Sequence, residues 1–156
     1  SKHISKTTNH ARRRRLKGLG TLIKLAKQEL DVKRQQLSEI QENRDELAKI
    51  LRLKEKELIK ERELVGKADN PADFRFDTYL ARIQQEEYGI QQLIEERDEV
   101  ITAMSDEIAE AYAEVKKYEI LLERNEKAIE DEEKREEALM LDELAIDGHM
   151  RKNSQQ

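Results

Sequence analysis

Two long stretches of the chain carry apolar residues that alternate three and four positions apart, and the single proline, Pro71, lies between them. From Ile23 to Val65, 9 of 13 such positions are apolar, and from Phe76 to Glu132 the count is 13 of 17. A mean spacing of about 3.5 residues keeps one stripe, here called the seam, turned toward a partner helix. The pattern predicts an all-α fold, a long antiparallel two-helix coiled-coil hairpin.

The bend of this hairpin is marked by residues that end and start helices. Gly66 follows the first seam as a helix C-cap, and Asn70 with Pro71 supplies an N-cap and a proline at the first helical position. We therefore place the turn near residues 66–70. A dimer of bent helices shares much of the same pattern and remains an alternative.

The hairpin is expected to occupy residues 16–147, with the second helix overhanging the first. Residues 1–15 are basic and lack hydrophobic periodicity, so we expect a disordered tail there. Residues 148–156 begin at Gly148, which can stop a helix, and are expected to form a flexible C-terminal tail.

Composition limits what this chain can be. Charged residues make up 42% of it and hydrophobic residues 37%, which suffices for a seam but not for a three-layer core. There is no cysteine, which excludes disulfides and thiolate metal sites. No apolar run approaches the roughly 18 residues of a membrane span, so no integral membrane segment is predicted. His3, His10 and His149 lie in the expected tails without a neighbouring ligand, so we predict no metal site.

Charge is divided unevenly along the chain. Residues 1–28 carry nine lysines or arginines and no acid, whereas residues 126–147 carry ten acids and three bases. An antiparallel hairpin brings these segments together, which favours it over a parallel dimer. With the turn centred near Asn70, residues 12–15 are expected opposite residues 126–128.

The same alignment makes two predictions about polar seam positions. Lys54 is expected across from Glu87, a pair that could select the register, while Arg44 is expected to face Arg97 unfavourably.

A basic cluster near the start could contact phosphates, an anionic membrane or an acidic protein. No aromatic residues are interleaved for base stacking, and the net charge is -5, so a nucleic-acid partner is not predicted. A protein partner or a solvated helix start fits better. The cluster comprises Arg12, Arg13, Arg14, Arg15 and Lys17.

Catalytic motifs are not apparent. Acid pairs such as Glu132 with Glu133 lie on a charged helix face, where no apolar pocket separates their pKa values. Residues 18–20 lack the strand, lysine and hydroxyl of a phosphate-binding loop. We predict that the chain is not an enzyme and binds no cofactor.

Two apolar features lie outside the paired seam. A second stripe beside the seam has members spaced by seven, Tyr79, Glu86, Leu93 and Val100, and Tyr88 also lies off the seam. This stripe indicates either a widened core or a docking surface. In the overhang from Ile129 to Ile146, apolar side chains have no partner helix within the hairpin, so a partner protein is expected to cover them.

Four segments resemble the FliJ family of flagellar type III export, which has YscO-like homologues in injectisomes. They are residues 19–26, 76–90, 110–123 and 141–145, and the resemblance extends over about residues 19–152. It implies a soluble coiled-coil component that is not an enzyme, located in the cytoplasm and associated peripherally with the inner membrane at the flagellar base.

The resemblance also implies partners and their contact residues. Both chain ends would enter the ring of a FliI-type export ATPase as a central stalk that promotes ring assembly, while the rod contacts an FlhA-type export gate and export chaperones. The implied ATPase-facing residues are Leu19, Leu22, Ile23, Ala26, Ile129, Leu139, Leu141 and Leu144. The implied gate-facing residues are Tyr79, Ile83, Gly89, Ile90 and Leu93. A structural coiled-coil adaptor or holdase chaperone outside type III export is the alternative.

Overall fold

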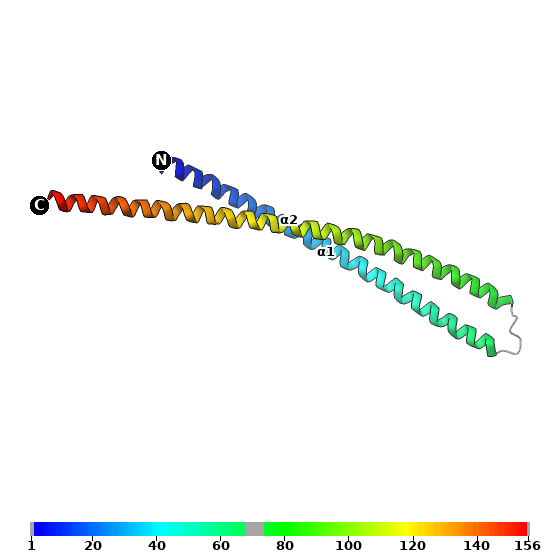
Figure 1. The fold of residues 1–156 in the computed structure, drawn as a ribbon. Coiled ribbons are helices and arrows are strands. Elements are labelled where there is room, and N and C mark those ends of the chain that lie inside the picture. The colour runs from blue at the N-terminus through cyan, green and yellow to red at the C-terminus, as the bar shows by residue number, and fades with distance from the viewer. Residues whose placement is uncertain (1, 68–73, 156) are drawn as a thin grey trace. The chain divides into compact units, whose positions relative to one another are not determined.

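The described part of the chain forms two long helices. The computed structural model describes residues 2–67 and 74–155, and within these ranges it contains α1 (Lys2–Lys67), α2 (Phe74–Ser154) and no strand (Figure 1). Alanine, leucine, glutamate, lysine and arginine dominate both helices, and these are the strongest helix formers. The predicted all-α hairpin of two packed helices is confirmed.

The chain divides into two units, each built from part of both helices. The central unit is Glu29–Glu110. Two interhelical contacts show that its helices are antiparallel: Arg44 Nε lies 2.9 Å from Asp98 Oδ1, and Lys54 Nζ lies 2.7 Å from Glu86 Oε2. Its buried apolar core consists of Leu30, Leu58, Ile83 and Ile94.

The terminal unit combines Ser1–Gln28 with Ala111–Gln156. Its buried apolar residues are Ile23, Val115 and Ile129. Two ion pairs join its helices in antiparallel order, Arg13 with Glu133 and Lys27 with Glu119, the latter with Nζ and Oε1 3.2 Å apart.

The predicted seam is the packed face of both helices. Every predicted seam position is buried or half-buried except Glu61, which is exposed. In α1 the same spacing continues toward the N-terminus through Leu19, Leu16, Arg12 and Asn9, all buried or half-buried. Removal of an apolar side chain from water contributes about 1.5–3 kcal/mol when the residue is fully buried, so we assign the hydrophobic stabilisation of the hairpin to the seam.

The register differs in detail from the expectation. Arg13 pairs with Glu133, more than one helical turn beyond the residues 126–128 expected there. Lys54 pairs with Glu86 instead of its neighbour Glu87. Lys27 pairs with Glu119, which is displaced from the expected alignment in the same direction, so the helices of the terminal unit are aligned differently from the expectation. At Lys54 the displacement is one residue, which a long side chain can span.

The ends of the chain also differ from the expectation. Residues 2–15 belong to α1, and residues 148–154 belong to α2, so neither expected tail lacks helical structure where it is described. Gly66 and Gly148 lie inside helices, and no glycine among the described residues has the positive φ that a helix-ending glycine adopts. The centre of the predicted turn, with Asn70 and Pro71, lies outside the described residues.

Candidate functional site

The end of α2 carries a group of apolar side chains that no described residue covers. In the terminal unit, Lys6 of α1 lies beside Glu136, and residues 137–155 beyond it are all exposed. We call these residues the C-terminal apolar surface. They are Leu139, Met140, Leu141, Leu144, Ile146 and Met150, each between 56% and 65% exposed.

The C-terminal apolar surface winds around the helix instead of forming a single stripe. At about 100° per residue, Leu139, Ile146 and Met150 share one face and continue the seam spacing, whereas Leu141 and Leu144 lie on nearly the opposite face. The six residues extend over roughly 220° of the helix circumference. A helix that is apolar on several sides is typical of one that is surrounded, so a partner would have to contact α2 from more than one direction.

The ATPase-facing residues implied by the resemblance fall into two groups. Leu139, Leu141 and Leu144 belong to the exposed surface just described, and Leu22 on α1 is 47% exposed. The others pack in the hairpin: Ile23 and Ile129 are buried, while Leu19 and Ala26 are half-buried.

Ile129 therefore does not lie in an uncovered overhang. Since α1 begins at Lys2, helical residues of α1 reach this part of α2, and Arg13 and Leu16 lie beside Ile129. The uncovered part of α2 starts later in the sequence than predicted.

The gate-facing residues implied by the resemblance lie in the first turns of α2. Ile83 is buried, Tyr79 and Ile90 are half-buried, Gly89 is exposed and Leu93 is 40% exposed. A gate protein could reach only the exposed members of this set without opening the seam.

Tyr79 is held by two neighbours on the same helix. Its ring centroid lies 6.4 Å from that of Phe76, and Arg82 Cζ lies 5.5 Å from the centroid of the tyrosine ring. Such a cation–π contact is an electrostatic attraction between the guanidinium charge and the face of the ring. Arg75 and Thr78 line the same shallow pocket, which combines aromatic surface with positive charge.

Charged side chains on the same helix and on facing helices shift one another's pKa values. The hydrogen bond from Lys54 lowers the pKa of the Glu86 carboxyl and raises the pKa of Lys54. Lys116, and then Lys27, lower the pKa of Glu119 in the same way. These pairs keep the carboxylates charged, which does not suit them to proton transfer near neutral pH. The bonds from Lys54 and Lys27 join the two helices, whereas Lys116 lies on the same helix as Glu119.

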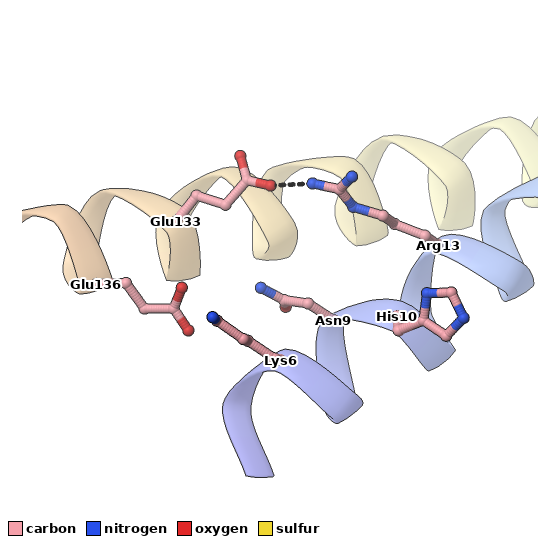
Figure 2. A pocket seen from close by; sticks show the side chains of 6 residues that line it. All are labelled: Lys6, Asn9, His10, Arg13, Glu133 and Glu136. Atoms are coloured by element: carbon pink, nitrogen blue, oxygen red, sulfur yellow. Dashed lines mark hydrogen bonds and ion pairs between the residues drawn. The ribbon is translucent and has the colours of Figure 1, made fainter. Parts of the chain in front are cut away.

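A cluster of polar side chains lies in the terminal unit, near the start of α1. Figure 2 shows Lys6 pointing toward Glu136 of α2, Arg13 paired with Glu133, and Asn9 between them, whereas His10 points away from both glutamates. Asn9 is only 8% exposed, and its Oδ1 has no hydrogen-bond partner. We call these residues the N-terminal polar cluster: Lys6, Asn9, His10, Arg13, Glu133 and Glu136.

Of the remaining residues in the predicted basic cluster, Arg12 is half-buried, and Arg14, Arg15 and Lys17 are exposed.

Within the described residues no group of three or more histidines, cysteines or acids could hold a metal ion. No helix there is long and apolar enough to cross a membrane.

Comparison with known protein families shows to which family the chain belongs. The family model described as Flagellar FliJ protein matches residues 16–154. The chain belongs to the FliJ family. No curated protein and no solved structure matched the chain. Membership makes this a coiled-coil protein related to flagellar export, in a family of non-catalytic components.

The FliJ match includes the C-terminal apolar surface and the surface around Tyr79, while residues 2–15 of α1 lie outside it. The sequence analysis did not single out several strongly exposed apolar residues, among them Leu64, Met140 and Met150. For Met150 a signal was present, because it continues the seam spacing of α2 past Glu132. Met140 carries no such signal.

Proposed function

We propose that this FliJ-family chain is a central stalk of the flagellar export apparatus. The C-terminal apolar surface would insert into the ring of a FliI-type export ATPase and promote assembly of the ring. The exposed residues around Tyr79 and Leu93 would contact an FlhA-type export gate. The protein would work in the cytoplasm, peripherally associated with the inner membrane at the flagellar base, and would also escort export chaperones.

The observation that carries this proposal is the distribution of exposed apolar residues around the end of α2. Single-sided docking would need one stripe, but Leu139 and Leu144 lie on different faces of the helix. A ring that encloses the helix contacts all faces at once. Because the faces carry different side chains, ring subunits would meet different surfaces, and such differential contacts can favour one ring state over another.

The gate contact is supported by the second exposed set. Leu93 is 40% exposed and Tyr88 67% exposed, in the central unit and well separated in sequence from the ATPase-facing residues. One chain could therefore present different surfaces to two partners.

The decisive experiment measures steady-state ATP hydrolysis by the flagellar export ATPase of the same organism, titrated with this chain. We expect saturable stimulation together with formation of larger ATPase assemblies. A chain truncated after Glu137 and the double variant Leu141→Gln/Leu144→Gln should both lose the stimulation. Tyr88→Gln, which changes an equally exposed side chain elsewhere on α2, should keep it.

The proposal fails if the intact chain neither stimulates the ATPase nor promotes its assembly. Equal stimulation by the intact chain and the Leu141→Gln/Leu144→Gln variant would place the contact elsewhere on the rod. Suppression of aggregation of unrelated unfolded proteins, without any effect on the ATPase, would instead favour a holdase or adaptor.

A further inference from the structure

The first turns of α1 are held on α2 differently from the rest of the helix. At Ile23 and Val115 the terminal unit is closed by apolar side chains that are 8% and 3% exposed. Toward the N-terminus, the residues facing α2 become Arg12 and Asn9, and the α2 residues beside them are glutamates. The seam thus changes from apolar to polar between Leu16 and Asn9.

The polar part of this contact is weakly stabilising. The side chains of Arg13 and Glu133 are 62% and 48% exposed, and an ion pair that is this accessible to water contributes little and is screened by salt. Asn9 adds a buried oxygen without a hydrogen-bond partner, which opposes closure. The segment is therefore held mainly by attraction between a basic helix start and an acidic stretch of α2.

We infer that residues 6–15 of α1 form an electrostatic strap, which detaches from α2 locally while the apolar seam from Ile23 onward stays closed. Detachment removes Arg13 from its place beside Ile129. The apolar area available to a partner would then extend from the C-terminal apolar surface back toward Ile129. This inference concerns the chain alone and does not depend on the ATPase.

Amide hydrogen exchange of the intact chain tests the strap. Raising sodium chloride from about 0.05 M to about 0.5 M shortens the screening length from above 10 Å to a few ångströms. We expect exchange of residues 6–15 to accelerate on the order of five- to tenfold. Exchange of residues 37–47, which lie in the central unit, should change much less. Slower or unchanged exchange of residues 6–15 at high salt would overturn the inference.

Charge variants separate attraction from general destabilisation. Glu133→Lys should accelerate exchange of residues 6–15 already at low salt, whereas Glu137→Lys, on the next turn but outside the N-terminal polar cluster, should have a smaller effect. The charge swap Arg13→Glu/Glu133→Arg should restore slow exchange. Failure of the swap to restore protection, with helicity by circular dichroism unchanged, would contradict an electrostatic strap.

The substitution Asn9→Leu tests the role of Asn9 independently of the charge variants. Replacing the buried amide by an apolar side chain removes the unpartnered oxygen and extends the apolar seam by one position. We expect slower exchange of residues 6–15 and a weaker dependence on salt. Exchange that remains as fast and as salt-dependent as in the unaltered chain would contradict the role assigned to Asn9.

Discussion

Arg44 donates a hydrogen bond from Nε to Oδ1 of Asp98 on the other helix, at 2.9 Å. This contact resolves the conflict that the heptad pattern predicts between Arg44 and Arg97. Arg97 in turn donates from Nε to Asn43 Oδ1 at 3.1 Å. Each arginine thus finds an acceptor beside the other arginine, and the two positive charges are accommodated at adjacent seam positions.

Removing the Asp98 carboxylate should destabilise the hairpin. Asp98→Ala leaves Arg44 close to Arg97 without its strongest acceptor, the group that raises the pKa of Arg44. We expect a lower midpoint of thermal unfolding, measured by circular dichroism, and recovery when Arg44→Leu is added. Asp45→Ala is the control, because Arg44 approaches Asp45 only to 3.6 Å. An equal loss in Asp45→Ala would argue against the cross-helix contact.

The Lys54–Glu86 pair should make stability depend on acid pH. Lys54 lowers the pKa of Glu86 in the folded chain, so the folded state binds protons less readily than the unfolded one. The stabilisation is complete above the ordinary carboxyl pKa of 4.5 and is lost as pH falls below it through the lowered folded pKa.

Urea unfolding of the unaltered chain and Glu86→Gln at several pH values tests this dependence. The difference between the two proteins should be largest near neutral pH and vanish in strong acid. Glu95→Gln, an exposed neighbour on α2, should show a smaller difference at every pH. A Glu86→Gln difference independent of pH would refute the ion pair as its cause.

Two adjacent residues of α2 should differ sharply in their contribution to stability. Ile94 is 5% exposed in the seam, whereas Leu93 is 40% exposed beside it. Ile94→Ala should reduce the free energy of unfolding by about 2–5 kcal/mol, because it leaves a cavity in the seam. Leu93→Ala should cost less than about half of that. Urea titration followed at 222 nm measures both, and similar losses would mean that Leu93 is part of the core.

The C-terminal apolar surface should be dispensable for folding. Leu141 and Leu144 are each 60% exposed, so Leu141→Gln/Leu144→Gln should change the free energy of unfolding by no more than about 0.5 kcal/mol. Ile129→Gln, which buries an amide at a position 7% exposed, should be strongly destabilising. Urea unfolding compares them. A large loss from the Leu141/Leu144 pair would show that the chain itself uses this surface.

The parts of the fold that depend on a periodic pattern of apolar residues could be predicted from the sequence. The seam positions from Ile23 to Val65 and from Phe76 to Glu132 pack as predicted, Glu61 excepted, because spacing along a helix determines which side chains share a face. The ends of the helices were not predicted correctly. Glycine at Gly148 costs only about 1 kcal/mol within a helix relative to alanine, and the surrounding helix formers outweigh that cost.

The helical structure, the apolar face of each helix and the acidic and basic stretches can be predicted from the sequence alone. The contact of Arg13 with Glu133, the burial of Ile129 and the exposure of Leu141 follow only from the packing of the two helices. The spacing of apolar residues is a property of a single helix, whereas the register is the alignment of two helices and depends on both. A seam that repeats every seven residues matches a partner seam equally well after a shift of one heptad, so the sum of individual side-chain contacts selects the alignment.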